Sequence, residues 1–371
     1  EMGIMASTFY GEPSSELTVI AVTGTNGKTS VATYVAKALE YLDAEVLLLS
    51  TAGDYVGGKK IETHRKAGTS LEVLELHKIM RKYLDAGVNY CCLEATSIAL
   101  DQDRLSGVDI DVAVFTNLTQ DHLDYHKDFE DYGHAKSLLF KDLKENAVAI
   151  SNFDDDFGKK IIAETKAKVI SYGQHHTDYD YSFIMEGTTP SGTECKINGQ
   201  ALHLPLIGAF NMYNATSSFA VLSELALPTK NIIEALEHVS GVKGRMEMVE
   251  SSRNIFALVD YAHSPDALEN VLKTLKEIPH NSIITVFGCG GDRDRTKRPH
   301  MARIGQSMSD KVIFTSDNPR TESLDQIFAD MREGINPDQQ NFHFVESREE
   351  AIRRAVTIAI ENDIILVAGK G

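Results

Sequence analysis

A glycine-rich segment near the start of the chain carries the residue types that hold phosphate groups. Gly24-Thr25-Asn26-Gly27-Lys28-Thr29 follows the apolar run Thr18–Val22 and precedes a helical pattern. Backbone N–H groups in such a turn and at a helix start face an anion together. The spacing is a shortened GxxGKT, because the standard phosphate loop would need a glycine at Val22. We expect Lys28 to contact the β and γ phosphates of a nucleotide and Thr29 to ligate Mg²⁺. The alternative is a tight turn without a ligand.

Polar residues that follow two further predicted strands could hold the metal. Glu94 follows the apolar run Tyr90–Leu93, and the strand that ends at Phe115 is followed by Asp121, His122, Asp124 and His126. Because parallel sheets bind ligands at the carboxyl ends of their strands, Glu94 and His122 could meet Mg²⁺ beside the glycine-rich loop. The alternatives are a solvated acid at a strand end and two histidines at a helix start. Zinc held by His122 and His126 is a weaker option, since no third soft ligand is nearby in sequence.

Cations gather in two segments of an otherwise acidic chain. Gly288-Cys289-Gly290-Gly291-Asp292-Arg293-Asp294-Arg295 follows an apolar run and is continued by Lys297-Arg298-Pro299, and Asp317-Asn318-Pro319-Arg320 follows another. Arginines on such turns can bind a carboxylate or phosphate bidentately. The alternatives are a solvated loop whose Asp and Arg residues pair with each other, and an Asx-type turn.

Charge and composition narrow the class of protein. The 54 acidic and 37 basic residues give a formal net charge of −17, which disfavours nucleic acid and anionic membranes as general partners. No apolar run is long enough for a membrane span, and the first residues lack a secretory signal. The four cysteines form no CxxC pair and no disulfide framework. We expect a cytoplasmic protein without membrane insertion.

The order of elements predicts how these residues are positioned. At 371 residues the chain is long enough for two or three domains. Apolar strand-like runs alternate with amphipathic helical runs, which predicts an α/β fold with mainly parallel sheets. The strands predicted for a first, doubly wound sheet are Thr18–Val22, Val46–Leu49, Val88–Leu93, Val112–Phe115, Ala147–Ile150 and Val169–Tyr172. Polar and Gly-rich sequence from about Thr177 to Pro205 indicates an antiparallel excursion, and helical patterning resumes at Asn211.

A second, smaller Rossmann-like unit is predicted to begin near Gly241-Val242-Lys243-Gly244-Arg245, where two glycines suit a linker. Its helices include Asp266–Ile278, and Ser347 with Glu350 forms a capping box before a helix over Ala351–Ile360. Its predicted strands are Ile255–Val259, Ile283–Phe287, Val312–Phe314 and Ile364–Val367.

Four segments together resemble the Mur ligases of bacterial cell-wall synthesis, specifically the E type, from about Phe9 to Gly371. They are Val22–Thr29, Phe115–His126, Val259–Asp266 and Gly288–Pro299. Asp317-Asn318-Pro319-Arg320 looks like the signature of the members that add meso-diaminopimelate, whereas lysine-adding relatives usually vary at the asparagine or arginine.

The resemblance implies a P-loop-type central domain, a Rossmann-like C-terminal domain and ATP-dependent amide formation. The activity would join meso-diaminopimelate to UDP-N-acetylmuramoyl-L-alanyl-D-glutamate (UDP-MurNAc-dipeptide) through an acyl phosphate, in peptidoglycan synthesis. The alternatives are an L-lysine-adding ligase, another superfamily member such as a folylpolyglutamate synthase or cyanophycin-type ligase, and a non-catalytic ATP-binding fragment.

The resemblance also implies roles for single residues. Lys28, His122 and Lys136 match the catalytic set. The positions matching Mg²⁺ ligands are Thr29, Glu94, His122 and Lys136, the last as a carbamate; its alternative is an exposed helix lysine. The remaining nucleotide contacts are Asn214 for adenine, Arg245 for the γ-phosphate and Asp260 for the ribose. The positions matching muramoyl-peptide contacts are Thr69, Thr96, Ser97, Gln102 and Arg104. The positions matching diamino acid contacts are Arg293, Asp317, Asn318, Pro319, Arg320 and Gly369.

Several positions depart from the family pattern. The usual Thr-Thr-Pro is Gly68-Thr69-Ser70, and the usual Ser-Ser-His after the metal glutamate is Thr96-Ser97-Ile98. Residues 1–16 resemble the linker from an N-terminal uridine-binding domain that we expect to be missing. We expect residues 17–241 to form the ATP-binding domain and residues 242–371 a truncated C-terminal domain, which lacks a glutamate expected just after Gly371.

Overall fold

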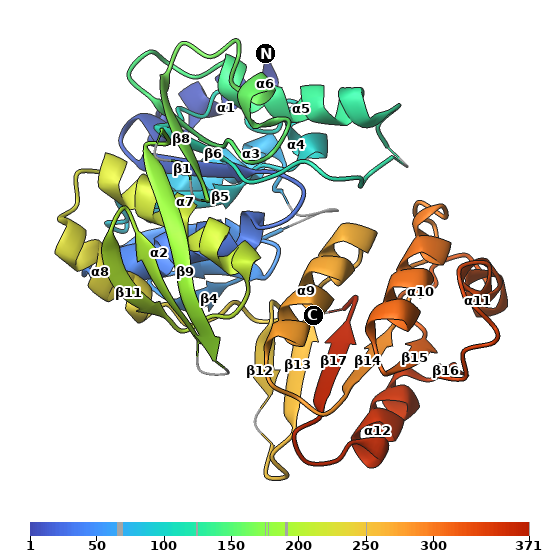
Figure 1. Cartoon of the computed structure of the whole chain (residues 1–371). Helices are drawn as coiled ribbons and strands as arrows, with labels where there is room; N and C mark the ends of the chain where they lie inside the picture. Colours follow the sequence, from blue (N-terminus) through green and yellow to red (C-terminus); the bar gives the residue numbers. More distant parts are fainter. Residues whose placement is uncertain are drawn as a thin grey trace. The chain divides into compact units, whose positions relative to one another are not determined.

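The computed structural model (Figure 1) describes residues 1–64, 70–123, 125–174, 176, 178–189, 192–249 and 251–370. Two compact units are present, and each is described by itself. The first holds nearly all of the chain up to Ser240, and the second holds the chain from Gly241 onward with short segments around Asp121 and Thr189.

Within the described residues, the first unit contains one sheet in the order β11-β10-β9-β8-β7-β6-β1-β5-β2-β3-β4. The central pairings are parallel, whereas β10 with β11, β2 with β3 and β3 with β4 are antiparallel. The bounds are β1 Thr18–Thr23, β2 Val46–Ser50, β3 Gly53–Val56, β4 Lys59–Ile61, β5 Tyr90–Glu94, β6 Val112–Phe115, β7 Val148–Asn152, β8 Lys168–Gln174, β9 Tyr181–Thr189, β10 Gly192–Ile197 and β11 Gln200–Leu204.

Helices cover both faces of this sheet. Val19 and Ala21 of β1 belong to a core with residues of α3 and α5, such as Ile79 and Phe140. Ile20 is equally buried, and because successive strand residues point to opposite faces it faces the other side. The bounds are α1 Met2–Phe9, a 3₁₀ turn η1 Pro13–Ser15, α2 Lys28–Tyr41, α3 Val73–Leu84, α4 Ser97–Asp101, α5 Phe129–Lys141, α6 Gly158–Ile161, α7 Ala209–Glu224 and α8 Thr229–Glu237.

The second unit has a sheet in the order β12-β13-β17-β14-β15-β16, which can be followed in Figure 1. Only the β12–β13 pairing is antiparallel among its described pairs. The strands are β12 Glu247–Val249, β13 Phe256–Asp260, β14 Ile283–Phe287, β15 Lys311–Thr315, β16 Phe342–Val345 and β17 Ile364–Ala368. The helices are α9 Pro265–Glu277, α10 Lys297–Met308, α11 Leu324–Arg332 and α12 Arg348–Ile358.

Successive residues of β14 pack against helices on opposite faces of the sheet in the second unit. Val286 packs in one cluster with Ala351 and Ala355 of α12. The neighbouring Phe287 lies against Gly305 of α10, where a Cβ would overlap its ring. Helices α10 and α12 therefore lie on opposite faces of β14.

The predicted α/β class with mainly parallel sheets is confirmed, and the ten predicted strands are present with ends shifted by at most two residues. The Ser347 half of the predicted capping box is confirmed, since the Ser347 hydroxyl accepts from Glu350 N over 3.3 Å. The helix itself, α12, begins at Arg348 and ends at Ile358. The segment from about Thr177 to Pro205 was predicted to form antiparallel strands. Its first strand, β9, differs from this prediction because it pairs with β8 in parallel.

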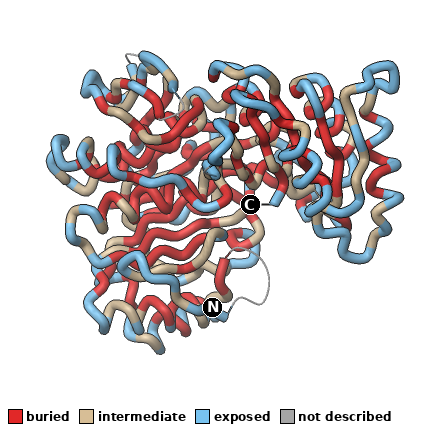
Figure 2. Tube along the Cα trace, turned by 90° about the horizontal axis from the view of Figure 1, so that it is seen from below, coloured by how far each residue is buried: buried red, intermediate tan, exposed pale blue. Residues whose placement is uncertain are grey.

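Figure 2 shows that the strands of both sheets are mostly buried and that many connecting segments are exposed. All four cysteines are free and buried. Burial raises the pKa of the Cys91, Cys195 and Cys289 thiols to about 12. Across the described ranges, none of the helices has the length and apolar character needed to span a membrane.

Candidate active site

The glycine-rich loop leaves the carboxyl end of β1 between two strands that run parallel to it. Val22 pairs with Glu94 of β5, and Thr23 pairs with Phe115 of β6. The segments that leave β5 and β6 are therefore the neighbours of the loop on either side. The sequence predicted this edge of the sheet as the ligand site, and the strand order places Glu94 there.

Two glycines allow the loop to fold closely. Gly24 has a φ of +146° and Gly27 a φ of +87°, which other residues rarely adopt. A Cβ on Gly24 would overlap the Thr116 hydroxyl, and one on Gly27 would lie 2.5 Å from Asn214 Oδ1. The loop is thus packed between the end of β6 and helix α7. Asn214, matched to an adenine contact, is buried beside Gly27.

Asn117 fastens the loop to the segment that follows β6. Its side-chain Oδ1 accepts from Asn26 N over 2.9 Å, its Nδ2 donates to Asn26 O over 3.1 Å, and its backbone oxygen accepts from Thr25 N over 2.8 Å. Asn117 lies within the Phe115–His126 segment, and no role was predicted for it from the sequence. Its position two residues after the end of a predicted strand was the one feature of the sequence that could have indicated a role at the ligand-binding edge of the sheet.

Lys28 and Thr29 open helix α2 directly after the loop. The Lys28 ammonium donates to Gly24 O over 2.8 Å and to Thr25 O over 2.7 Å, so it lies over the loop. Thr29 is buried in the first helical turn. Because a helix N-terminus also carries partial positive charge, the cation and the helix end favour an anionic ligand at the same place.

Glu94 is a buried acid whose orientation is fixed. Its carboxylate accepts from Thr51 N over 2.6 Å and from Thr51 Oγ1 over 2.9 Å, where Thr51 directly follows β2. Such hydrogen bonds offset part of the cost of burying a carboxylate. A carboxylate in a fixed orientation is therefore held at the end of β5, the strand next to β1.

Lys136 of α5 is only 1% exposed, which excludes the alternative of an exposed helix lysine. Its ammonium donates to Gly24 O over 2.8 Å and lies 4.4 Å from the centre of the Tyr132 ring. The Tyr132 hydroxyl in turn shares a 3.1 Å hydrogen bond with Thr25 Oγ1. Helix α5 thus places Lys136 against the glycine-rich loop, 112 residues away in sequence.

The two candidate histidines have different surroundings. His126 is buried, with Nε2 2.9 Å from Ser97 Oγ and Nδ1 3.4 Å from Asp131 Oδ2. His122 has a φ of +54°, and its backbone N donates to Asp121 Oδ1 over 2.9 Å. In the part of the chain that the structure describes, no three His, Cys, Asp or Glu side chains gather as a metal site. A zinc site therefore has no support among these residues.

Four of the residues matched to the muramoyl-peptide lie in or beside α4; they are Thr96, Ser97, Gln102 and Arg104. Thr96 caps this helix through its hydroxyl. Arg104 Nη2 donates to Gln102 Oε1 over 2.7 Å just after the helix. Thr69, predicted for the same substrate, and Asp124 lie outside the described residues.

The second unit gathers its predicted residues at the carboxyl edge of its own sheet. Strand β17 lies between β13 and β14, and β15 lies beside β14. These four strands are parallel. The segments that leave them therefore share one edge; they begin at Tyr261, Gly288, Ser316 and Gly369.

Arg320 lies against the glycine turn that follows β14. Its Nη1 donates to Gly291 O over 2.7 Å, and a Cβ on Gly290 would lie 3.0 Å from the same nitrogen and 3.8 Å from Arg293 Cγ. Both arginines are exposed. Arg295 pairs with Asp330 of α11 at 2.8 Å, so the alternative that this loop only pairs internally is wrong for Arg295.

The Asp317–Arg320 turn also approaches the segment that follows β17. Gly369 has a φ of +96°, and a Cβ there would lie 3.4 Å from Asp317 Oδ2. Asn318 Oδ1 accepts from Lys370 Nζ over 3.3 Å. Pro319 connects Asp317 and Asn318 to Arg320 in the chain. All residues predicted to contact the diamino acid therefore lie on adjacent segments.

Asp260 and Arg245 lie near one another at the β13 end of this sheet. The Asp260 carboxylate accepts from Met246 N and Ala262 N, both over 2.7 Å. Burial raises the pKa of Asp260, although these hydrogen bonds oppose the shift. The Arg245 guanidinium lies 4.3 Å from the centre of the Tyr261 ring.

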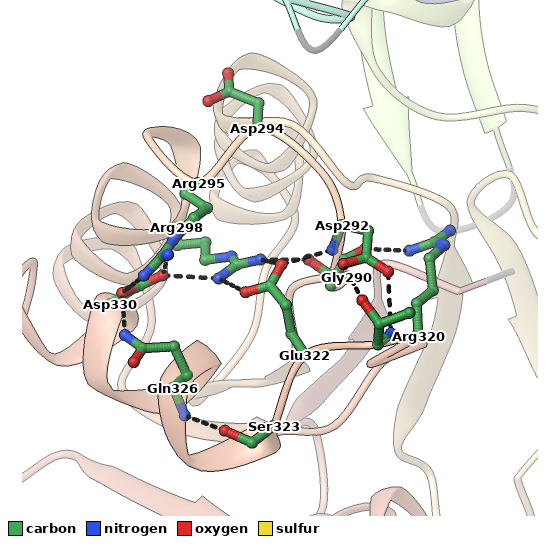
Figure 3. Close-up of polar contacts among 12 residues, drawn as sticks. Gly290, Asp292, Asp294, Arg295, Arg298, Arg320, Glu322, Ser323, Gln326 and Asp330 are labelled. Atoms are coloured by element: carbon green, nitrogen blue, oxygen red, sulfur yellow. Dashed lines mark hydrogen bonds and ion pairs between the residues drawn. The ribbon is translucent and has the colours of Figure 1, made fainter.

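Arg298 is the main residue whose part in this site the sequence did not reveal. In the sequence Arg298 is one of a group of cations, whereas its side chain is fully buried and contacts two acids (Figure 3). Its partners Glu322 and Asp330 are 24 and 32 residues away. Only the order of strands and helices brings them together.

Comparison with known proteins identifies the family. Residues 22–222 match the Mur ligase middle domain, and residues 244–371 match the Mur ligase, glutamate ligase domain. The UDP-N-acetylmuramoyl-L-alanyl-D-glutamate--2,6-diaminopimelate ligase of Clostridium botulinum is 44% identical over 376 residues, covering 100% of this chain and 76% of the relative. The protein of the same name from Parabacteroides distasonis is 39% identical over 373 residues, with the same coverage.

Solved structures agree with this result. A structure titled for the same 2,6-diaminopimelate ligase has 34% identity and a TM-score of 0.71, over 99% of this chain and 77% of the other. Folylpolyglutamate synthase of Mycobacterium tuberculosis, complexed with ADP, has a TM-score of 0.83 over 100% of this chain and 91% of the other. At 19% identity, that second likeness shows the fold alone. The chain belongs to the Mur ligase family.

Proposed function

We propose that this chain uses ATP to join meso-diaminopimelate to UDP-N-acetylmuramoyl-L-alanyl-D-glutamate during peptidoglycan synthesis. The observation that carries the proposal is the glycine-rich loop of the first unit, with Lys28 over it, Glu94 beside it and the buried Lys136 bonded to it. Relatives that bear the name of this activity are 39–44% identical over the whole chain.

The chemistry has two steps. A carboxylate resists attack by an amine because its carbon is electron-rich and oxide is a poor leaving group. Transfer of the γ-phosphoryl group from ATP to the D-glutamate carboxylate forms an acyl phosphate and releases ADP. The amine of diaminopimelate then attacks the acyl carbon, phosphate leaves with the C–O electron pair, and the amine loses a proton. The loop amides and Lys28 bind and orient the phosphates.

The residues at the loop fit a Mg²⁺ ion. Thr29 and Glu94 offer a hydroxyl and a carboxylate, the hard oxygen ligands that Mg²⁺ prefers. Both are buried, and Glu94 is held by Thr51. We assign Thr29 and Glu94 to one ion and His122 with Lys136 to a second. Bound Mg²⁺ offsets the negative charge that develops during phosphoryl transfer.

We propose that Lys136 works as a carbamate. Its reaction with CO₂ replaces a buried cation by an anion suited to a metal. The modified Nζ keeps one N–H, which can still donate to Gly24 O, now 2.8 Å away. This hydrogen bond would hold the carbamate in place without a change in the backbone.

The second unit supports the choice of a diamino acid with two carboxylates. We assign Arg320 and Arg293 to the distal carboxylate, because guanidinium groups match carboxylates bidentately. Asp317 and Asn318 are assigned to the distal amine, and Pro319 and Gly369 to the shape of the pocket. Lysine lacks the distal carboxylate and leaves the arginines without an anion.

The remaining assignments follow the same activity. Asn214, Arg245 and Asp260 are assigned to adenine, γ-phosphate and ribose, in that order. Thr69, Thr96, Ser97, Gln102 and Arg104 are assigned to the muramoyl-peptide. We place the reaction in the cytoplasm, because free thiols are typical of a reducing compartment. The net charge of −17 favours small-molecule substrates over nucleic acid.

Release of ADP in the presence of both substrates tests the proposal. We expect repeated turnover to require UDP-MurNAc-dipeptide, meso-diaminopimelate and Mg²⁺ together, because without the amine each enzyme molecule can release at most the one ADP that accompanies its acyl phosphate. Release that is unaffected by omission of the amino acid would contradict a ligase.

A further inference from the structure

Arg298, at the start of α10, joins the two segments that carry the proposed diamino acid site. Its side chain is 0% exposed. Nη2 donates to Gly290 O over 3.1 Å and to Glu322 Oε1 over 2.7 Å, and Nη1 donates to Glu322 Oε2 over 2.8 Å (Figure 3). One guanidinium thus holds the glycine turn after β14 and the carboxylate just after the Asp317–Arg320 turn.

Glu322 extends this connection back to the glycine turn. Its Oε1 also accepts from Asp292 N over 2.6 Å. Three N–H groups, two from Arg298 and one from Asp292, therefore point at one carboxylate. The hydrogen bond from Arg298 is the main reason why the pKa of Glu322 is lowered to about 2. The carboxylate is charged at neutral pH.

Further hydrogen bonds fix the two turns against each other. The Asp292 carboxylate accepts from Thr321 N over 3.0 Å and from Thr321 Oγ1 over 2.7 Å. Gly291 N donates to Asn318 O over 2.9 Å, and Arg320 Nη1 donates to Gly291 O over 2.7 Å. The place of the Arg320 guanidinium therefore depends on the backbone that Arg298 and Glu322 hold.

Asp330 is the second acidic partner of Arg298, and unlike Glu322 it binds Arg298 from helix α11. It accepts from Arg298 Nη1 over 2.7 Å, from Arg295 Nε over 3.0 Å and from Gln326 Nε2 over 2.9 Å. These contacts anchor Arg298 to α11, whereas the hydrogen bonds between the two turns run through Glu322. Asp330 therefore offers a matched control.

We propose that Arg298 and Glu322 are positioning residues for substrate selection: their buried ion pair sets the position of Arg320 against the glycine turn, and thereby the preference for a diamino acid with a distal carboxylate. This inference rests on the proposed function for the identity of the substrate. The support for the positioning role is separate: it is the set of hydrogen bonds that join the glycine turn after β14 to the Asp317–Arg320 turn.

The test compares Glu322→Gln with Asp330→Asn. An amide offers one oxygen where three N–H groups need acceptors, so Glu322→Gln must loosen at least one tie between the turns. We expect the KM for meso-diaminopimelate to rise roughly ten- to a hundredfold, as misplaced substrate contacts do, and the preference over lysine to shrink. The KM for ATP should change little. Asp330→Asn should leave the KM for meso-diaminopimelate within about threefold of wild type, because the hydrogen bonds between the two turns run through Glu322 and the new amide keeps one oxygen that can accept from Arg298.

Equal effects of the two variants on the KM for meso-diaminopimelate, or an equal rise in the KM for ATP, would overturn the positioning role. The variant Arg298→Lys adds a second comparison, because it keeps the charge but loses the fork that binds Glu322 bidentately. It should raise the KM for meso-diaminopimelate as Glu322→Gln does. A wild-type KM in Arg298→Lys would contradict the proposal.

Amide hydrogen exchange without substrate separates this inference from the proposed function. The amides of Asp292 and Thr321 should exchange at least about fivefold faster in Glu322→Gln, because local opening becomes easier, and near the wild-type rate in Asp330→Asn. Unchanged exchange in Glu322→Gln would overturn the positioning role. If the wild-type protein releases no ADP with meso-diaminopimelate, the proposed function fails, and the exchange rates still decide the positioning role.

Discussion

The buried ammonium of Lys136 donates a hydrogen bond to the carbonyl oxygen of Gly24 over 2.8 Å. This contact joins the middle of α5 to the first residue of the glycine-rich loop. Gly24 O also accepts from Lys28 Nζ over 2.8 Å, so two lysines from different helices meet at one carbonyl oxygen. Two cations this close favour an anion between them, either a phosphate or a carbamate on Lys136 itself.

The carbamate proposal predicts the behaviour of Lys136→Ala. This variant should be nearly inactive and should recover part of its activity when acetate or formate is added, because a small carboxylate can replace the missing anion. The measurement is ADP release over a titration of the added acid. Lys141→Ala on the same helix is the control, since Lys141 is exposed and its ammonium lies 2.9 Å from Glu164 Oε2 on the surface.

Two outcomes would contradict a carbamate at Lys136. One is full activity of Lys136→Ala without any added acid. The other is full activity of the wild-type enzyme after CO₂ and carboxylates have been removed from the buffer.

The phosphate loop predicts large losses from two small changes. Lys28→Ala removes the cation over the loop, and Thr29→Ala removes the proposed Mg²⁺ ligand. Each should lower ATP turnover by at least about a hundredfold, as the loss of a preorganised electrostatic contact does. Lys37→Ala is a control on the same helix, where Lys37 donates to Ser240 O over 2.9 Å. Normal turnover in Lys28→Ala would rule out this role for the loop.

The diamino acid site predicts a loss of specificity in Arg320→Ala. Removal of the guanidinium should lower the ratio of kcat/KM for meso-diaminopimelate to that for lysine by about tenfold, a modest effect because Arg320 is exposed and its charge is partly screened. ADP release at saturating substrate should change less. Arg353→Ala is the control, since Arg353 pairs with Glu349 on the surface of α12. An unchanged ratio in Arg320→Ala would remove Arg320 from the site.

The buried Arg298 cluster predicts an acid-sensitive second unit. Hydrogen bonds from Arg298 and Arg295 lower the pKa of Glu322 and of Asp330 to about 2. Groups whose pKa is depressed by folding stabilise the native state above their unfolded pKa, about 4. That stability is lost as the pH falls toward 2. The urea midpoint of the wild type should therefore drop steeply between about pH 4.5 and pH 2.

Glu322→Gln should show a smaller drop over the same range, because one of the two depressed carboxyl groups is gone. Urea unfolding at several pH values measures the difference. An identical pH dependence in the wild type and Glu322→Gln would contradict the charge state assigned to Glu322.

The sequence predicted most of the central strands because a strand buried on both faces is a nearly continuous apolar run, as in Ile283–Phe287. It did not predict β3, β4, β12 or β16, which lie at or next to sheet edges and carry polar residues. Lys59 and Lys60 of β4, for example, are both exposed. Such strands form because a neighbouring strand offers hydrogen bonds, and that partner cannot be seen in a local pattern. Helix α1 lies within the segment expected to be a linker.

In the candidate site, too, features set by neighbouring residues could be predicted, whereas contacts between distant residues could not. The glycine-rich loop was predictable because its residues are contiguous and each has a local reason to be there. The family resemblance singled out Lys136, but the burial of this lysine against Gly24 depends on the packing of α5. The ion pairs of Arg298 join residues 24 and 32 positions apart, and no periodicity links such residues. Long-range polar contacts of this kind follow from the strand order.

The central claim is that this chain makes an amide bond between the dipeptide substrate and meso-diaminopimelate at the expense of one ATP. Its most direct test is mass spectrometry of the products, combined with the amount of ADP formed, when meso-diaminopimelate and lysine compete at equal concentration. We predict one product, heavier than UDP-MurNAc-dipeptide by meso-diaminopimelate less one water, in equal amount to the ADP. ADP without a coupled product, or the lysine adduct in equal yield, would contradict the account.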